Sequence, residues 1–520
     1  MLRHPPPEDA GLSSLLIKNA RVIDGTGSPA VNANIAVEND LITAVAPDLN
    51  IDAEQVIDAR GAVASPGFID MHSHGGAGII ERTTADSKAH DGVTTEVLGN
   101  CGSSPFPTDK FPSADAFFGL VDEVGTSINR AFLAGLDSIR AAVMGSGAEP
   151  ASPEQIRTMR DTLAGCIEEG AFGVSTGLIY PPGCFTTREE MAEIAKAAGD
   201  AGALYATHMR DEGDEIEDAI DEAAFIAKAS GARLHISHVK LSGKRNWHKI
   251  DWLEERLRGL IDSGIDLACD RYPYTASATD LGVLLPNWAH DGAAQQRMER
   301  LGDADARGRI ESEILGDHPE PEYWDTALIS AVPEGEDTAY NGKTLAEVAA
   351  MRDERPVETI MNLLARRESM PAIVIFSMCE ENLRRVLSWP FVAAGSDARA
   401  RIASEKFGTD KPHPRSYGTF ARFLGRYVRE ENVLALEEAV RRITSLPAER
   451  LGLRDRGVIR AGALADITIF DPDTIADRAT YHEPHQPSAG ILHVIVNGQP
   501  VIENGSHNGA LPGRILRRSG

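Results

Sequence analysis

The sequence PGFIDMHSHGG occupies residues 66–76 and joins an apolar segment to two histidines. It completes an apolar run over residues 61–71, which predicts a buried β-strand, and the glycines that follow predict a turn. His72 and His74 therefore stand at the carboxyl end of a strand. Because alternate residues of a strand share one face, their imidazoles point to one place, as metal ligands do. Two surface histidines in a glycine-rich loop are the alternative that this motif alone leaves open.

Length and composition describe a globular protein with more than one structural unit. The chain has 520 residues, of which 42% are hydrophobic and 25% charged. This length exceeds that of one ordinary domain and predicts a large barrel or sheet domain with a smaller partner. The net charge of −26 and the lack of a long basic run argue against a nucleic-acid partner.

The five cysteines are an odd number without paired spacing, which favours a reducing compartment over a disulfide scaffold. The first residues carry no sustained apolar segment after a basic one, so no secretory signal is recognised. No stretch of about eighteen apolar residues could span a membrane. We therefore expect a cytoplasmic protein without a membrane partner, whose partner is a small-molecule substrate, and we leave a homo-oligomer open.

Both ends of the chain read as short strands separated by turns. Apolar or alternating segments occur at residues 15–22, 33–38 and 41–45, and again at 466–470 and 494–501. Each group is too small to be stable alone. We therefore expect residues 1–62 and 456–520 to form one small β-sandwich, with the rest of the chain inserted between its two parts.

The middle of the chain, residues 63–455, alternates strand and helix. Eight segments rich in apolar residues are separated mostly by helical segments such as 153–169 and 188–201. The eight predicted strands cover residues 67–71, 93–98, 131–136, 173–175, 203–206, 233–237, 265–269 and 391–394. This pattern predicts an α/β fold, a (β/α)8 (TIM) barrel.

Residues 280–372 interrupt the alternation with an acidic, helix-leaning stretch that holds one short apolar run at 327–332. A structureless loop of this length would be unusual in a compact domain. We therefore expect an inserted helical subdomain that acts as a lid.

Residues of metal-ligand type follow several of the predicted strands. Enzymes of this fold carry their functional residues at the carboxyl ends of the strands. Besides His72 and His74, the strand ends carry Cys101, His208, His238 and Asp397. A thiolate, imidazoles and a carboxylate form a donor set suited to zinc. Taken singly, the cysteine could be a small buried apolar residue, the histidines core residues, and Asp397 a helix cap.

The sequence resembles the N-acyl-D-amino-acid deacylase (D-aminoacylase) family of the amidohydrolase superfamily over nearly its whole length. The resemblance rests on motifs spread along the chain, of which the cysteine and His-Pro-Arg motifs are the most specific. These motifs are GFIDMHSH (67–74), GVTT (92–95), GNCG (99–102), STGLIYPPG (175–183), THMR (207–210), SHVK (237–240), YPYT (272–275), GSD (395–397) and HPRSYGTF (413–420).

The resemblance implies a zinc hydrolase of linear amide bonds in N-acyl-D-amino acids. It implies one tightly bound zinc on Cys101, His208 and His238. A second metal position, weaker or vacant, would use His72, His74 and Asp397. Many superfamily members use a carboxylated lysine from the fourth strand, but residues 172–176 read FGVST and offer none.

The same resemblance assigns roles in catalysis and binding. Asp397 is implied to be the general base that takes a proton from the attacking water and passes it to the leaving amine. Lys240, Tyr272 and Arg415 match positions that bind the substrate α-carboxylate, for which an arginine offers a bidentate fork. The alternative for Arg415 is an ordinary ion pair with an acidic side chain.

Two segments depart from the family pattern. Residues 135–137 read GLD where relatives often have Gly-His, and residues 396–399 read SDAR where Ser-Asp-Gly is usual. Both lie on the expected substrate side and affect specificity more than chemistry. A dipeptidase for a carboxyl-terminal D-residue, a cyclic amide or imide hydrolase, and a degenerate barrel kept for binding are therefore retained as alternatives.

Overall fold

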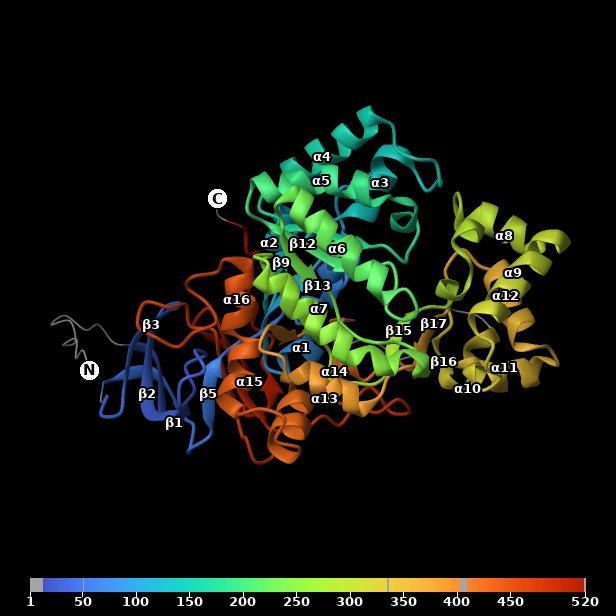
Figure 1. Ribbon diagram of the computed structural model, residues 1–520. Coiled ribbons are helices and arrows are strands. Elements are labelled where there is room, and N and C mark those ends of the chain that lie inside the picture. Colours follow the sequence, from blue (N-terminus) through green and yellow to red (C-terminus); the bar gives the residue numbers. More distant parts are fainter. Residues whose placement is uncertain (1–12, 50, 334–335, 403–408, 519–520) are drawn as a thin grey trace.

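The computed structural model describes residues 13–49, 51–333, 336–402 and 409–518 (Figure 1). The expectation that no secretory signal is present falls largely on residues 1–12, outside this part. Among the described helices, none combines the length and the apolar character needed to cross a membrane. The expected cytoplasmic location stays a prediction.

Eight parallel strand positions form the centre of the molecule, in chain order around a barrel. Adjacent strands pair in parallel. The third strand is divided into two pieces, and the N–H of Leu133 between them donates to the carbonyl of Leu98 in the second strand (2.9 Å), so the sheet is continuous there. This confirms the predicted (β/α)8 barrel. The strands are β6 (Phe68–Asp70), β8 (Val93–Leu98), β9 (Asn129–Phe132) with β10 (Ala134–Gly135), β11 (Gly173–Gly177), β12 (Leu204–His208), β13 (Arg233–Ile236), β14 (Leu267–Arg271) and β18 (Val392–Ala394).

Helices cover the outside of the barrel (Figure 1). Two of them begin at capping boxes, formed by Ser152 and Gln155 in one helix and by Thr187 and Glu190 in the next. The local sequence therefore determines where these two helices begin. Apolar faces of these helices pack onto the strands in one large core. The helices are α2 (Ala114–Val124), α3 (Leu136–Met144), α4 (Pro153–Glu168), α5 (Arg188–Asp200), α6 (Ile216–Ser230), α7 (Ile250–Asp262), α13 (Glu380–Ser388), α14 (Arg415–Arg422), α15 (Leu436–Ile443) and α16 (Ser445–Leu451).

The barrel closes where its first and eighth strands meet. The backbone N–H of Asp397 donates to the carbonyl of His72 (2.7 Å), and short strands β7 (Ser73–His74) and β19 (Ala398–Arg399) pair in parallel just beyond. Lys88, in the short helix α1 (Asp86–Ala89), is buried at this seam. Its ammonium donates to Asp70 Oδ2 (2.6 Å), Ser396 Oγ (2.6 Å) and the carbonyl of Ala398 (2.8 Å). One buried cation therefore ties the two strands together.

Replacing Lys88 with methionine is expected to destabilise the protein by about 3–5 kcal/mol, because the Asp70 carboxylate would stay buried without its partner. Urea unfolding of wild type and variant measures this loss. Lys228→Met, on the exposed face of α6, is the matched control and is expected to change stability by less than about 0.5 kcal/mol. Equal stability of the Lys88 variant and wild type would contradict the structural role of the cation.

Both ends of the chain contribute to one further sheet of nine strands. Its central junction joins β5 to β20 in antiparallel register, with Ala64 opposite Ile469, so strands about 400 residues apart in sequence are neighbours. A separate apolar core lies against this sheet. The strands are β1 (Ser13–Val22), β2 (Val31–Glu38), β3 (Leu41–Ala46), β4 (Ala53–Asp58), β5 (Val63–Pro66), β20 (Ile467–Phe470), β21 (Ile491–Val496), β22 (Gln499–Glu503) and β23 (Ser506–His507).

The single strand expected over residues 61–71 is wrong, because Gly67 divides it between two sheets. The N–H of Gly67 donates to the carbonyl of Asp466, just before β20 of the terminal sheet (2.8 Å), whereas the N–H of Phe68 donates to the carbonyl of Gly92, just before barrel strand β8 (3.1 Å). A Cβ at Gly67 would lie 2.1 Å from Thr94 Oγ1, so only glycine fits this crossing. The apolar run is continuous since both sheets bury it.

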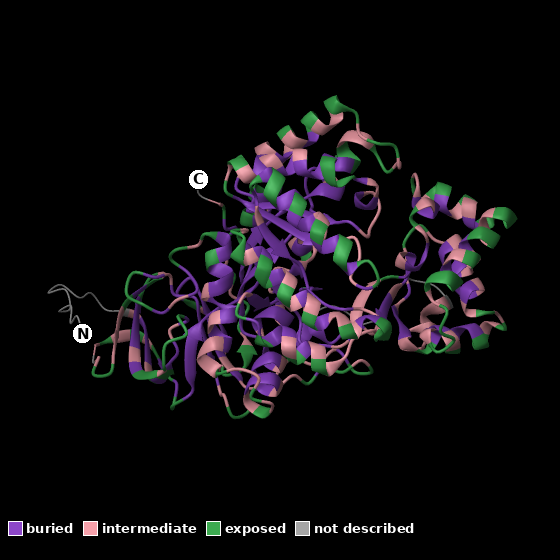
Figure 2. Ribbon diagram, viewed as in Figure 1, coloured by how far each residue is buried: buried purple, intermediate pink, exposed green. Residues whose placement is uncertain are grey.

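The stretch after the seventh barrel strand forms a separate lobe with its own apolar core. Strands β15 (Ser277–Asp280), β16 (Ala327–Ala331) and β17 (Ala372–Ile375) pair in antiparallel register at its base. Figures 1 and 2 show its helices apart from the barrel, with buried positions among the exposed ones. Closure over substrate stays a prediction. The helices are α8 (Ala294–Gly302), α9 (Ala304–Asp317), α10 (Tyr323–Thr326), α11 (Leu345–Arg352) and α12 (Pro356–Ala365).

Candidate metal-dependent active site

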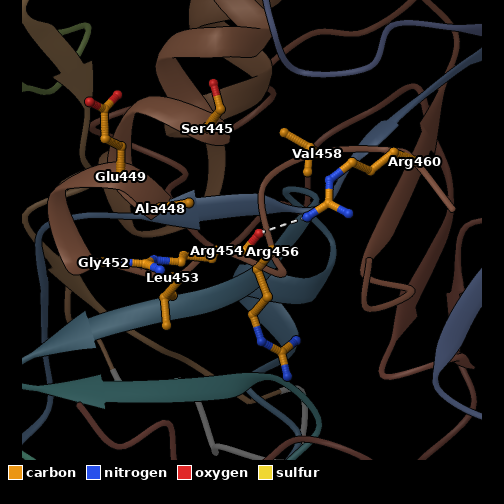
Figure 3. Close-up of a pocket in the computed structure, with 9 residues that line it drawn as sticks. All are labelled: Ser445, Ala448, Glu449, Gly452, Leu453, Arg454, Arg456, Val458 and Arg460. Atoms are coloured by element: carbon orange, nitrogen blue, oxygen red, sulfur yellow. Dashed lines mark hydrogen bonds between the residues drawn. The ribbon is translucent and has the colours of Figure 1, made fainter. Parts of the chain in front are cut away.

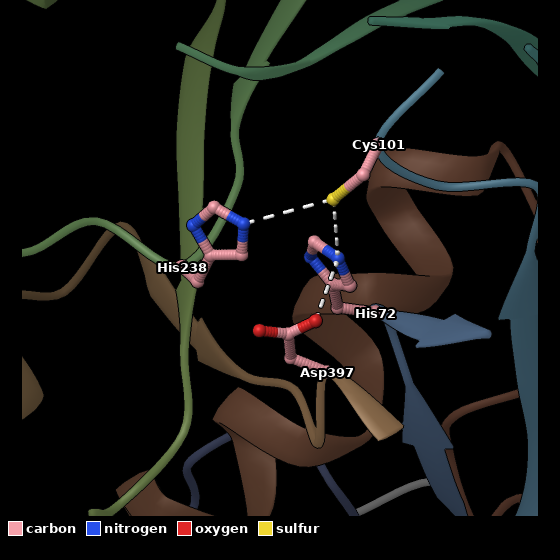
Figure 4. Close-up of side chains that lie close together, drawn as sticks. All are labelled: His72, Cys101, His238 and Asp397. Atoms are coloured by element: carbon pink, nitrogen blue, oxygen red, sulfur yellow. Dashed lines mark hydrogen bonds and ion pairs between the residues drawn. The ribbon is translucent and has the colours of Figure 1, made fainter. Parts of the chain in front are cut away.

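Four side chains of metal-ligand type meet at the carboxyl end of the barrel (Figure 4). One ligand atom from each of His72, Cys101, His238 and Asp397 lies within 4.8 Å of the others. The Cys101 sulfur is 3.3 Å from His72 Nε2 and 3.7 Å from His238 Nε2. These residues come from the first, second, sixth and eighth strand positions, so the barrel gathers what the sequence separates.

Three of these residues have left-handed backbone conformations. The φ angles are 51° at Cys101, 35° at His238 and 51° at Asp397, and none of the three is glycine. Such conformations cost about 1–3 kcal/mol each and persist where the surrounding structure enforces them, often at functional sites. Each turn redirects the chain directly after a barrel strand, which aims the side chain toward the shared centre.

The remaining predicted ligands join the same cluster. His74 Nε2 lies 2.8 Å from Asp397 Oδ1, and His72 Nε2 lies 3.5 Å from the same oxygen. The ring of His208 meets the ring of His238 at a centroid distance of 4.4 Å. Asp397 caps no helix, since the short strand β19 follows it. The structure thus brings together all six residues that the sequence proposed.

The chemistry of the cluster fits a zinc ion. Both ring nitrogens of His208 are buried and make no hydrogen bond within the described residues, so they are free to coordinate. Burial would raise the pKa of the Cys101 thiol, but His72 and the nearby imidazoles of His208 and His238 bring that pKa well below its ordinary value. A thiolate with imidazoles, which give up their extra protons when a metal binds, is a donor set that zinc prefers.

A buried carboxylate, Asp270, orients the histidines of the first and sixth strands. Its Oδ2 accepts from His72 Nδ1 (3.0 Å) and from His235 Nε2 (2.9 Å), and its Oδ1 accepts from the backbone N–H of His238 (2.9 Å). Because Nδ1 of His72 is occupied in this way, its Nε2 faces the cluster. Sequence reasoning missed Asp270, although it directly follows the predicted strand 265–269, as the predicted ligands follow theirs; in the structure it lies near the end of β14.

The three residues expected to bind a carboxylate lie beside the cluster. Arg415 Nη1 is 2.8 Å from Asp397 Oδ2, and its guanidinium stacks 4.7 Å from the Tyr272 ring centre. The Lys240 ammonium lies 5.9 Å from the same ring. The Tyr272 hydroxyl is buried without a hydrogen-bond partner in the described chain. An unsatisfied donor between two cations suits an anionic ligand.

Two further residues of the site were not assigned from the sequence. Glu212 lies 3.8 Å from His208 Nε2 and 2.9 Å from His238 Nδ1. The Tyr180 ring faces His208 at 4.9 Å, and its hydroxyl lies 3.1 Å from Thr279 Oγ1 in the inserted lobe. Both belong to loops beyond strand ends, where no periodic pattern marks the direction of a side chain.

A separate cavity of about 480 Å³ lies beside α16 (Figure 3). In that helix Arg450 donates to the carbonyl of Leu234, near the amino end of β13, so the cavity lies away from the strand ends that carry the cluster. None of its lining residues belongs to the site. They are Ser445, Ala448, Glu449, Gly452, Leu453, Arg454, Arg456, Val458 and Arg460.

The fold and the cluster together define a metal-dependent hydrolase barrel, and comparison with known proteins agrees. The model of the amidohydrolase family matches residues 55–502. The chain therefore belongs to the amidohydrolase family, which confirms the superfamily inferred from its motifs.

Individual relatives show which members of the family this chain is similar to. The chain is 34% identical to N-acyl-D-glutamate deacylase of Alcaligenes xylosoxydans xylosoxydans, covering 97% of this chain and 96% of that protein. It is 33% identical to D-aminoacylase of the same organism, covering 97% and 98%. The crystal structure of N-acyl-D-glutamate deacylase from Bordetella bronchiseptica, complexed with zinc and a phosphonate mimic of the tetrahedral intermediate, superposes with a TM-score of 0.83 at 31% identity, covering 98% of this chain and 100% of that one.

Proposed function

We propose that this protein is an N-acyl-D-amino-acid deacylase. It hydrolyses the amide bond of an N-acyl-D-amino acid and releases a carboxylate, such as acetate, and the free D-amino acid. The observation that carries this proposal is the position of Lys240, Tyr272 and Arg415 directly beside the six-residue cluster. A carboxylate held there presents the neighbouring amide to the ligands, and the relatives named above act on N-acyl-D-amino acids.

The proposal includes one tightly bound zinc and a second, weaker metal position, the division that the family resemblance implies. Cys101, His208 and His238 would hold the first, and His72, His74 and Asp397 the second. A zinc ion bound here would polarise the amide carbonyl and make water acidic enough to attack near neutral pH. Asp270 and the buried strand ends keep the imidazoles directed at the centre, so little reorganisation is needed.

Asp397 is the proton carrier in this proposal. Burial opposes its ionisation, but Arg415 and His72 hold the pKa of its carboxyl well below the ordinary value, so the group is an ionised carboxylate at neutral pH. Its Oδ1 faces His74 and His72 at the centre of the cluster. It takes one proton from the attacking water and passes that proton to the nitrogen as the C–N bond breaks, so that the amine leaves neutral.

Arg415→Met is expected to raise the KM for N-acetyl-D-amino acids about 10–100-fold, because a charged hydrogen bond worth about 1.5–3 kcal/mol is removed. For the matching N-acetyl-D-amino-acid amides, which lack the carboxylate, the KM is expected to rise far less. Steady-state kinetics on both substrate series measures the difference. Arg454→Met, at an exposed arginine outside the site, is the control. Equal losses on both series would contradict the carboxylate contact.

The handedness of the substrate is tested separately. We expect turnover of N-acetyl-D-amino acids and neglect of their L-counterparts when both are supplied as matched libraries. Dipeptides that end in a D-residue and cyclic amides complete the panel. Preference for L-substrates, or activity on cyclic amides alone, would overturn the deacylase while leaving the zinc hydrolase intact.

A further inference from the structure

Glu212 touches both halves of the proposed site. Its Oε1 lies 2.9 Å from His238 Nδ1 and 2.5 Å from Lys240 Nζ. Lys240 Nζ is in turn 2.9 Å from His238 Nδ1. Glu212 and Lys240 are 12% and 3% exposed at their side chains, so water screens these contacts little. A proposed metal ligand and a proposed carboxylate ligand thus share one oxygen atom.

The chemistry of His238 turns this sharing into competition. Its Nε2 faces the Cys101 sulfur, so Nε2 is the nitrogen available to a metal. A neutral imidazole that coordinates through Nε2 carries its hydrogen on Nδ1, and that N–H needs an acceptor. Glu212 Oε1 is the acceptor within reach. The Lys240 ammonium can only donate, so it competes for the same oxygen and cannot bond to Nδ1–H.

We propose that Glu212 is a positioning residue that couples the carboxylate subsite to the metal site. When Lys240 binds a substrate carboxylate instead of Glu212, the full negative charge of Glu212 turns to His238, which strengthens this imidazole as a ligand and tightens zinc binding. Because such coupling is reciprocal, bound zinc also favours carboxylate binding at Lys240. The inference deepens the proposed function and rests on its assignment of His238 and Lys240.

Zinc release tests the coupling without any substrate. Zinc-loaded protein is mixed with an excess of chelator, and the release of the metal is followed with a zinc-sensitive dye. Glu212→Gln is expected to weaken zinc binding about 10–100-fold, the usual effect of losing a partner of a metal-bound histidine. Lys240→Met is expected to slow release several-fold, because the competing cation is gone.

Matched controls separate this effect from general electrostatics. Glu215 is exposed and lies three residues after Glu212, so Glu215→Gln removes the same charge outside the site. Lys249→Met removes a cation that donates to the carbonyl of Asp214. Both controls are expected to release zinc as the wild type does. Melting temperatures show that each variant is folded, and the Lys240 arm decides alone if the Glu212 variant does not fold.

The outcomes distinguish this inference from the proposed function. Zinc release unchanged in Lys240→Met, or shifted equally in Lys249→Met, would overturn the coupling while leaving the deacylase in place. Unchanged zinc affinity in a folded Glu212→Gln variant would overturn it as well. Absence of bound zinc in the wild type would instead contradict the proposed metal site itself.

Discussion

Asp397→Asn is expected to lower turnover about 10²–10⁴-fold, while KM changes less. The amide keeps the size of the side chain but accepts no proton at neutral pH, so the water loses its base and the leaving amine loses its acid. The variant also removes the charge that pairs with Arg415, 2.8 Å away, so a small change in KM is expected as well. Steady-state kinetics on an N-acetyl-D-amino acid measures both parameters.

A structural role for Asp397 makes a different prediction. As a purely structural ion-pair partner of Arg415 it would contribute to stability and nothing to turnover. Melting temperature and turnover, measured on the same variant, therefore separate the two roles. Asp473→Asn, in an exposed turn, is the control for loss of a carboxylate. Near-normal turnover of Asp397→Asn would show that another group moves the proton.

The second large effect concerns the metal. We expect about one tightly bound zinc per chain, and Cys101→Ala or His208→Ala is expected to remove it together with nearly all turnover, because three protein ligands are the minimum of catalytic zinc sites. Elemental analysis of protein purified without added metal counts the zinc. His208→Ala is the sharper test. The ring nitrogens of His208 make no hydrogen bond in the described structure, so the variant removes a proposed metal ligand without also removing a hydrogen bond.

The control for the thiol is Cys379→Ala, because Cys379 is another free cysteine and lies outside the metal-ligand cluster. It is expected to keep both zinc and turnover. Full zinc and full activity in Cys101→Ala would show that the site is misassigned. Loss of zinc with retained turnover would separate the metal from the reaction.

The barrel and the residues that gather at its strand ends were predictable because both depend on local signals. An apolar segment followed by a turn marks a strand end, as at Cys101 and Asp397, and the barrel rule then places these ends together. The break at Gly67 was not predictable, since hydrophobicity is the same in the two sheets that share the segment. What distinguishes them is the neighbour of each backbone N–H, Asp466 or Gly92, and only the folded chain brings these near.

Fewer of the residues on the substrate side than on the metal side could be predicted from the sequence. Glu212 follows His208 by four residues in a loop, and nothing local states that its carboxylate reaches both His238 and Lys240. Asp270 could have been found by the strand-end rule, but its role as a shared acceptor depends on His72 and His235 from other strands. Pairwise partners of this kind are properties of the assembled fold rather than of one segment.

The closing seam of the barrel has a consequence for biosynthesis. His72 emerges early from the ribosome, whereas Asp397, whose N–H bonds to it, is translated about 320 residues later. Domains commonly fold as units during synthesis. Cys101, His208 and His238 are all present once about half the chain has been made, so the nascent protein acquires the three proposed zinc ligands long before Asp397, the proposed base. In the proposed mechanism, metal binding can therefore precede competence for hydrolysis, because the proposed base arrives only with the strand that completes the barrel.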